Sequence, residues 1–95
     1  MSYKLEFVES ALKEWGELDS AVREQFKKKL AERLESPIIS SSRLSSMIYC
    51  YKIKLKSSGY RLVYKVLGKE IVVLIVAVGK RERNAVYKSA MKRTK

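Results

Sequence analysis

Basic side chains recur at alternate positions in one stretch of the sequence, and this spacing can gather positive charge on a single surface. Every second residue from Lys52 to Lys56 is a lysine, and the residues between them are apolar. Turn residues follow at 57–59, and the chain then returns with Arg61. Because alternate residues of a strand share a face, a hairpin puts Lys52, Lys54 and Arg61 close together. No carboxylate interrupts the stretch, so this face suits a polyanion.

Such a cluster of cations can assist the cleavage of RNA, in which a ribose 2′-hydroxyl attacks the neighbouring phosphate. The reaction needs a base for the hydroxyl proton, neutralisation of the phosphorane charge and stabilisation of the leaving 5′-oxygen. Arginine and lysine neutralise phosphate charge directly, arginine by bidentate contact. An unperturbed lysine has a pKa of about 10.4 and is a poor base at neutral pH. Crowding by Lys52 and Arg61 is expected to lower the pKa of Lys54, although bound phosphate would reverse part of that shift.

The same residues also fit a basic, solvated face without a catalytic role, since lysines protect exposed sheet edges. Arg81 and Arg83, which follow an apolar run, fit ordinary charges at the start of a helix equally well. Tyr87 is either a half-buried core aromatic or a residue that stacks on an unpaired base. For Tyr60 and Tyr64 the core role is favoured. The residue types alone therefore leave catalysis and simple charge as alternatives.

The charge of the whole chain points to an anionic partner. The 95 residues, predicted to form one domain over 1–95, carry a formal net charge of +11. Residues 1–37 hold seven basic and eight acidic side chains, a net charge of −1, whereas residues 38–95 carry +12. This asymmetry favours nucleic acid or an acidic protein over a membrane surface.

Several classes of site are excluded by what the sequence lacks. Cys50 is the single cysteine and histidine is absent, so disulfide frameworks, the usual zinc sites and histidine-based triads are excluded within one chain. No metal or cofactor is expected. The N-terminus has no signal-peptide pattern, and the longest apolar run, Ile71 to Val78, is too short to span a bilayer. A cytoplasmic protein without a membrane partner is predicted.

Two helices are predicted in the first part of the chain, after a strand over 3–8 that alternates in polarity. The first helix should be capped by Ser10 and weaken at Gly16, and the second should be capped by Asp19 or Ser20 and end at 36–37. The inward-facing residues are expected to be Ala11, Leu12, Trp15 and Leu18 in the first helix, and Val22, Phe26, Leu30 and Leu34 in the second. The opposite, charged face of the second helix is expected to be solvated.

Three strands and a helix are predicted in the remainder. A serine-rich loop over 38–47 should cover the sheet edge, before a hairpin whose inward row is Tyr49, Tyr51, Ile53 and Leu55. A turn at 68–69 precedes a central strand over 71–78, apolar on both faces and ended by Gly79. The terminal helix over 84–93 should direct Val86, Ala90 and, less strongly, Met91 inward. The class is α+β with an antiparallel meander, and the partner of the first strand is left open.

The order of these residues resembles a known family. YKIKLKSSGYRLVY, followed by the apolar strand and VGKRERNAVY, is similar to the RelE toxins of the RelE/ParE toxin–antitoxin superfamily, in particular the enterobacterial ones. The resemblance runs along essentially the whole chain, with LKEW and VREQFKKKL as weaker blocks. It implies a microbial-RNase-like α+β fold of order β-α-α-β-β-β-α. In that fold two N-terminal helices and one C-terminal helix surround a four-stranded, mostly antiparallel sheet.

The resemblance also implies roles for individual residues. Lys54 resembles the general base and Arg81 the general acid or leaving-group stabiliser. Lys52 and Arg61 resemble the contacts to the phosphate and the transition state, and Tyr87 resembles the residue that stacks on an mRNA base. Three flanking residues are expected to bind RNA, namely Lys56, Lys80 and Arg83.

The implied activity is that of a ribosome-dependent mRNA interferase. Such an endoribonuclease enters the A site of the 70S ribosome, contacts rRNA and mRNA, and leaves a 2′,3′-cyclic phosphate. An acidic RelB-like antitoxin neutralises it, and the complex represses its own operon, so operator DNA is bound only through the antitoxin. The sequence departs from the family's pattern at Leu44-Ser45-Ser46 and Ile48-Tyr49, which bears on loop conformation and antitoxin fit. Two alternatives stay open: a ParE-type gyrase inhibitor, and a non-catalytic RNA- or ribosome-binding module.

Overall fold

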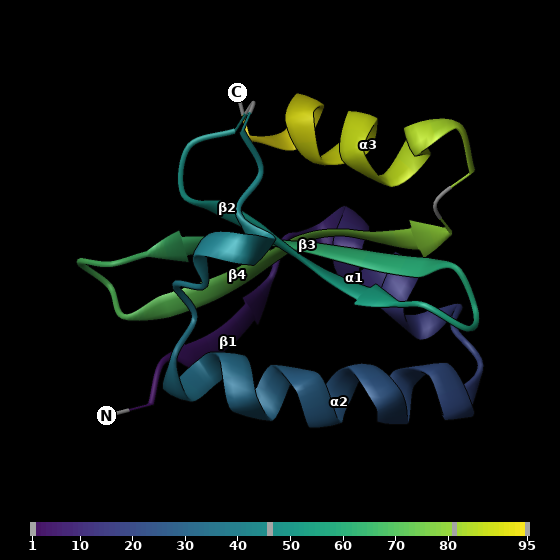
Figure 1. Cartoon of the computed structure of the whole chain (residues 1–95), viewed down its shortest axis with the longest axis horizontal. Coiled ribbons are helices and arrows are strands. Elements are labelled where there is room, and N and C mark those ends of the chain that lie inside the picture. The colour runs from purple at the N-terminus through teal and green to yellow at the C-terminus, as the bar shows by residue number, and fades with distance from the viewer. Residues whose placement is uncertain (1, 46, 81, 95) are drawn as a thin grey trace.

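The computed structural model describes residues 2–45, 47–80 and 82–94, apart from the side chain of Arg83. Seven helices and strands follow one another in this part of the chain: β1 (Lys4–Phe7), α1 (Glu9–Gly16), α2 (Ser20–Glu35), β2 (Cys50–Leu55), β3 (Tyr60–Leu67), β4 (Val72–Lys80) and α3 (Ala85–Arg93). Two short 3₁₀ turns, η1 (Ser40–Ser42) and η2 (Glu82–Asn84), lie in the connections. The predicted α+β class and the order β-α-α-β-β-β-α are confirmed (Figure 1).

The four strands form one mixed sheet in the order β1-β4-β3-β2. The last three strands form the predicted antiparallel meander, because short turns join each to the next. β1 lies parallel to β4, with Lys4 opposite Val72 and Phe7 opposite Ile75. β4 is therefore central, as its apolar sequence predicts, and the partner of the first strand is identified.

β4 is longer at its C-terminal end than the sequence predicts. Gly79 was expected to break the strand, but it pairs with Arg61, and Lys80 pairs with Tyr60. The expectation is wrong because pairing with β3 continues beyond the apolar run. At the other end, Ile71 precedes the strand with a φ of 55°.

A bulge interrupts the pairing of β3 with β4. The partners of consecutive β3 residues change from Ala77 to Ile75, which leaves Val76 as an extra residue in β4. Val76 and Ala77, although neighbours in the chain, therefore belong to the same apolar cluster on the α3 side of the sheet. A bulge of this kind bends the strand and redirects its backbone groups.

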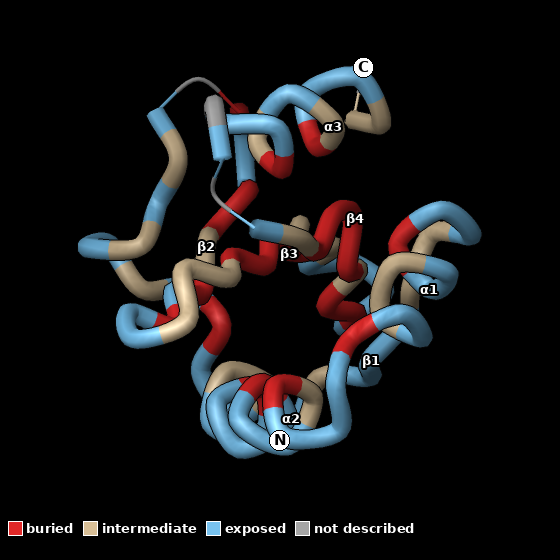
Figure 2. The backbone as a smooth tube through the Cα atoms, turned by 90° about the vertical axis from the view of Figure 1, so that its right-hand side faces the viewer, coloured by how far each residue is buried: buried red, intermediate tan, exposed pale blue. Residues whose placement is uncertain are grey.

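Helices cover both faces of the sheet, as Figures 1 and 2 show. α1 and α2 cover one face and enclose the larger apolar cluster: Ala11, Leu18, Val22, Phe26, Leu30, Tyr51, Ile53, Leu55, Leu62, Tyr64, Val66, Val73, Ile75 and Val78. α3 and the segment before β2 cover the other face and enclose a smaller cluster: Met47, Cys50, Val63, Val76, Ala77, Val86 and Ala90. No helix in the described part of the chain is both long and apolar enough to cross a membrane.

The beginning of α1 and one of its inward positions differ from the prediction. Ser10 was expected to cap the helix, but the helix begins at Glu9 and Val8 occupies the capping position. Val8 still donates a backbone hydrogen bond to Ile75 (3.0 Å), so the chain enters the helix directly from the sheet. Leu12 was expected to face inward and is 54% exposed, because α1 contacts the sheet through Ala11, which is fully buried.

The second helix agrees with the prediction more closely. α2 begins at Ser20 after Asp19 and ends before Ser36, and Val22, Phe26 and Leu30 are buried. Its exposed face carries an ion pair between Lys27 and Glu24 (3.2 Å). Here the residue pattern and the packing agree because one face of a long helix meets the sheet.

Besides Leu12, two further hydrophobic residues predicted to face inward are exposed. Tyr49 is 62% exposed with a φ of 63°, so the inward row of the hairpin begins at Tyr51. Tyr49 precedes β2, which begins at Cys50, so the alternation of the strand does not extend to it. Met91 is 42% exposed because α3 meets the sheet through Val86 and Ala90. The predicted loop over 38–47 does reach the edge strand, through a bridge from Arg43 to Tyr51.

Candidate active site

The cations of the hairpin share one face of the sheet, as their spacing predicts. Lys54 lies directly opposite Arg61 in the β2–β3 register, and Lys52 lies opposite Val63. Side chains at opposite positions of an antiparallel pair have Cβ atoms about 5 Å apart. The apolar cluster beneath α3 occupies one end of this face, whereas Lys54 is exposed at the other.

Arg61 is buried rather than solvated, which the sequence did not indicate. The residue is 7% exposed, and its Nη1 donates a hydrogen bond to the carbonyl of Tyr60 (3.0 Å). Its Nε is one of two buried side-chain polar atoms without a hydrogen-bond partner in the described part of the chain, the other being Ser58 Oγ. A buried cation is costly unless an anion or acceptor satisfies it. The guanidinium is thus held in place with donor capacity to spare.

Gly79 keeps the space beside Arg61 open. It lies opposite Arg61 in β4, so a side chain there would project from the same face. A Cβ built at Gly79 has no atom within 4 Å. The glycine is therefore not required by crowding, and its effect is to leave this part of the face unfilled.

A cavity of about 320 Å³ brings the candidate residues together. It is lined by Leu44, Met47, Lys52, Lys54, Arg61, Asn84 and Tyr87. Four of the five principal residues proposed from the sequence lie here, and no acidic side chain is among the lining residues that the structure describes. The lining comes from the hairpin, the segment before β2 and the start of α3. A phosphate group is the ligand that such a charge pattern favours.

A second cavity continues from the first. Its volume is about 670 Å³, and it shares Arg61 and Asn84 with the smaller cavity. The other lining residues are Lys56, Ser58, Gly59, Lys80 and Glu82. Two of the residues expected to bind RNA, Lys56 and Lys80, therefore line this extension. Lys80 also lies over the ring of Tyr60, with Nζ 5.7 Å from its centroid.

Arg81, the proposed leaving-group stabiliser, lies outside the described residues, and so does the side chain of Arg83. The neighbours of Arg81 on either side, Lys80 and Glu82, both line the larger cavity.

The surroundings of Tyr87 fit both a core aromatic and a residue that stacks on an unpaired base. It is half-buried and packs against the smaller apolar cluster, and it also lines the smaller cavity. Tyr64 has the predicted core role: it is fully buried, and its hydroxyl donates to the carbonyl of Pro37 (2.7 Å). Tyr60 is half-buried at the margin of the larger cluster.

Residues from three further segments lie at the site, although the sequence did not indicate them as site residues. Leu44, Met47 and Asn84 line the smaller cavity, and Arg33 of α2 binds the backbone of Lys52, one of its lining residues. Arg33 Nη1 donates to the carbonyl of Lys52 (3.3 Å) and to the hydroxyl of Tyr64 (2.8 Å). Asn84 has a φ of 58°, a conformation that asparagine tolerates better than most residues. Of these residues, only Asn84 has a sequence feature that could have drawn attention to it, namely an asparagine just before a helix.

Burial raises the pKa of two groups in the strands that carry the site. Burial raises the pKa of the Cys50 thiol, and the nearby charge of Lys65 opposes part of this shift. Burial also raises the pKa of the Tyr64 hydroxyl, against the opposing hydrogen bond and charge of Arg33. Both shifts move the pKa further from neutral pH, at which an ordinary thiol or phenol is already protonated. Within residues 2–45, 47–80 and 82–94, no three side chains of the types His, Cys, Asp and Glu gather to bind a metal.

Comparison with known proteins agrees with the fold and identifies the family. The family model described as "ParE toxin of type II toxin-antitoxin system, parDE" matches residues 5–85. The chain is 60% identical to the mRNA interferase toxin RelE of Escherichia coli strain K12 over 93 residues, which cover 98% of both chains.

Solved structures show the same similarity in three dimensions. The free R81A/R83A mutant of the E. coli toxin RelE superposes with a TM-score of 0.91 at 58% identity, and 98% of each chain is covered. The toxin of the intact E. coli RelBE toxin–antitoxin complex superposes with a TM-score of 0.84 at 60% identity, covering 86% of this chain and all of that one. By sequence and by fold, the chain belongs to the RelE toxins of the RelE/ParE superfamily.

Proposed function

We propose that this protein is the toxin of a type II toxin–antitoxin system and acts as an mRNA interferase, an endoribonuclease that cleaves mRNA. One observation carries the proposal: a single cavity is lined by Lys52, Lys54, Arg61 and Tyr87, without an acidic side chain among its described lining residues. A relative that is 60% identical over 98% of both chains is an mRNA interferase toxin. Cations and an aromatic side chain in one cavity suit a phosphate beside an unpaired base.

The proposed reaction is attack of a 2′-hydroxyl on the adjacent phosphorus. Lys54 accepts the hydroxyl proton, the new P–O2′ bond forms and the P–O5′ bond breaks. Lys52 and Arg61 neutralise the phosphorane, and Arg81 protonates or stabilises the leaving 5′-oxygen. The products are a 2′,3′-cyclic phosphate and a free 5′-hydroxyl. The buried position of Arg61 supports its part, because a guanidinium in a water-poor site binds an oxyanion strongly.

We propose that cleavage depends on the ribosome, with the mRNA bound in the A site. The chain has no histidine, and a lysine is a weak catalyst for proton transfer at neutral pH. Precise positioning of the RNA can supply about 7–11 kcal/mol of barrier lowering in the best cases. The ribosome would provide that positioning, and the basic surface around the cavities would contact rRNA through Lys56, Lys80 and Arg83. Action on ribosomes implies a cytoplasmic location.

We infer that an acidic, RelB-like antitoxin neutralises the toxin, since the E. coli relative is found in a RelBE complex. The antitoxin either covers the cations or displaces α3, which carries Tyr87. Amide exchange of residues 84–93 with and without antitoxin separates the two, because protection without displacement contradicts the second mode. The toxin–antitoxin complex is proposed to repress its own operon by binding operator DNA through the antitoxin.

The decisive experiment compares cleavage of one defined mRNA, free in solution and in the A site of a programmed ribosome. We expect cleavage only on the ribosome, within the A-site codon, with a 2′,3′-cyclic phosphate end. Ribosome binding without cleavage would instead indicate a non-catalytic binding module. Neither binding nor cleavage would favour a ParE-type gyrase inhibitor, the alternative that the name of the matching family model keeps in view.

A further inference from the structure

The helix that carries Tyr87 buries few of its own side chains. α3 spans Ala85–Arg93, and only Val86 and Ala90 among its residues are buried. Both are small, whereas the larger Met91 is 42% exposed. Burial of such small side chains removes little apolar surface from water. The packing of α3 therefore leaves room for a further contact that fixes its position.

The backbone edge of β4 next to α1 is only partly paired. β1 pairs with β4 from Val72 to Ile75, and Val8 makes the last backbone bond, to Ile75. β1 thus ends before the bulge at Val76, and β4 continues to Lys80. Unpaired backbone groups at such an edge need other partners.

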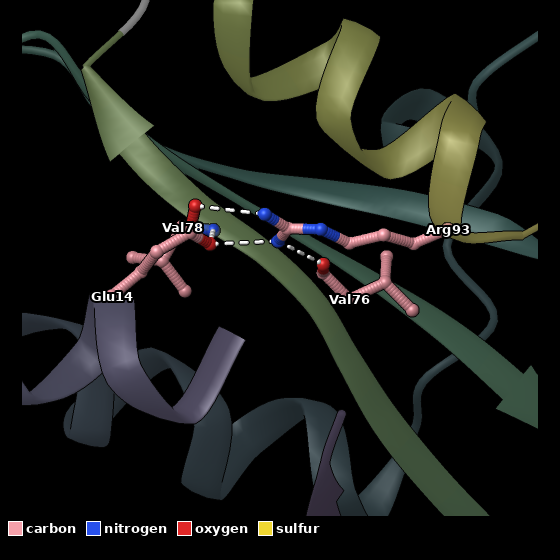
Figure 3. A network of polar contacts seen from close by, with 4 residues as sticks. All are labelled: Glu14, Val76, Val78 and Arg93. Atoms are coloured by element: carbon pink, nitrogen blue, oxygen red, sulfur yellow. Dashed lines mark hydrogen bonds and ion pairs between the residues drawn. The ribbon is translucent and has the colours of Figure 1, made fainter. Parts of the chain in front are cut away.

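Glu14 of α1 and Arg93 of α3 meet across this edge and satisfy two of its backbone groups (Figure 3). Arg93 donates from Nη1 to Glu14 Oε1 (2.8 Å) and from Nη2 to Glu14 Oε2 (3.1 Å). Arg93 Nη1 also donates to the carbonyl of Val76 (2.8 Å), and the amide of Val78 donates to Glu14 Oε1 (3.1 Å). We call this arrangement the Glu14–Arg93 clasp. It connects the last turn of α3 to α1 through β4.

The geometry of the clasp favours a well-defined contact over a loose surface pair. A bidentate guanidinium–carboxylate pair fixes orientation as well as distance. The two side chains are 24% and 28% exposed, so solvent screens them less than it screens a surface pair. The hydrogen bond to Glu14 is the largest factor that raises the pKa of Arg93, ahead of the opposing effect of burial.

We propose that Glu14 and Arg93 are positioning residues, which hold α3 against β4 so that Tyr87 and Asn84 line the cavity. Neither residue is among those that line it, so both act through α3. The effect on cleavage rests on the proposed function, whereas the effect on the position of α3 does not.

The test compares Arg93→Ala and Glu14→Gln with Lys92→Ala. Lys92 is exposed on the same helix, so its removal takes away the same charge without touching the clasp. Glu14→Gln keeps a similar shape and an acceptor for Val78, and it guards against a general failure of Arg93→Ala to fold. Arg93→Lys keeps the charge but loses the bidentate geometry, so it should restore function only in part.

Two measurements read the position of α3 without any activity. In amide exchange of the free toxin, Arg93→Ala should speed exchange over residues 86–93 by about tenfold or more relative to Lys92→Ala. The NMR signals of the Tyr87 ring should shift toward solvent-exposed values in the same variant. Unchanged exchange and unchanged Tyr87 signals in both clasp variants would overturn the proposal.

Cleavage on programmed ribosomes provides the third measurement. Arg93→Ala should lower kcat about tenfold while changing KM less, because Tyr87 is misplaced and the basic surface is intact. Loosened α3 with wild-type kcat would refute the positioning role. If the wild-type protein does not cleave at all, the proposed function fails, and the exchange and Tyr87 measurements still decide whether the clasp positions α3.

Discussion

The two faces of the sheet differ in what covers them, although the same strands form both. The face toward α1 and α2 is filled by large side chains such as Phe26, Ile53 and Tyr64, each at most 1% exposed. The face toward α3 has a smaller apolar cluster at one end and the basic cavity at the other. Stability is thus concentrated on one face, which leaves the other free to hold charges that do not favour folding.

Residues that affect cleavage and residues that affect stability should therefore lie on different faces, which substitutions can test. Changes to the cavity residues of the α3 face should affect cleavage more than stability, and changes to the buried residues of the α1–α2 face should do the reverse. Arg61 is the most informative position because it is a buried cation on the functional face.

The largest effect on activity is expected for Lys54→Ala. If Lys54 is the general base, its loss should lower the cleavage rate on programmed ribosomes by about 10²–10⁴-fold with little change in ribosome binding. Arg81→Ala should act in the same direction. Lys69→Ala is the matched control, since Lys69 is exposed in the turn after β3. A gradual loss of binding with each cation removed would instead indicate simple charge neutralisation.

The largest effect on stability is expected for Phe26→Ala. Phe26 is fully buried and its ring lies 6.2 Å from that of Trp15. Truncation should lower the free energy of unfolding by about 3–5 kcal/mol in urea denaturation, from lost burial and a residual cavity. In the fraction that stays folded, the cleavage rate should match the wild type. A selective loss of kcat in folded protein would show that the two faces are coupled.

Arg61→Met should lower activity without lowering stability. Cleavage should fall by about 10²–10³-fold, because a donor to the phosphorane is lost. The free energy of unfolding should stay level or rise by about 1 kcal/mol, because a buried charge with an unpartnered Nε is replaced by an apolar chain. Urea denaturation and single-turnover cleavage measure the two. Marked destabilisation would show that Arg61 contributes to folding through contacts that its single backbone bond does not explain.

The smallest effect concerns alkaline pH and the buried Cys50. Its pKa is raised above 9.0 in the folded protein, so the unfolded state loses the thiol proton first as pH rises. The free energy of unfolding should therefore fall above pH 9, by at most about 1.4 kcal/mol per pH unit from this group. Because the pKa of Tyr64 is also raised, the free energy of unfolding should fall further at higher pH as this hydroxyl titrates. The Cys50→Ala variant should show only this second decrease. Equal slopes in both proteins would contradict the assignment to Cys50.

Local patterns predicted which face most side chains of the hairpin, α2 and β4 occupy, but they wrongly placed Leu12, Tyr49 and Met91 inward. Alternation placed Lys52, Lys54 and Arg61 on one face of the hairpin, and the register confirms that placement. The fourfold spacing in α2 and the apolar run of β4 likewise identified buried positions. Leu44, Met47 and Asn84 could not be assigned to the cavity, because they come from separate segments whose approach depends on packing.

The sequence by itself determined the order of the elements, the basic face of the hairpin and the family, because these depend on residue type and short-range spacing. Tertiary structure alone decided the parallel pairing of β1, the bulge at Val76 and the burial of Arg61. It also joined Glu14 to Arg93, residues 79 positions apart. Contacts across such separations depend on how whole layers pack against one another, and no local pattern records that packing.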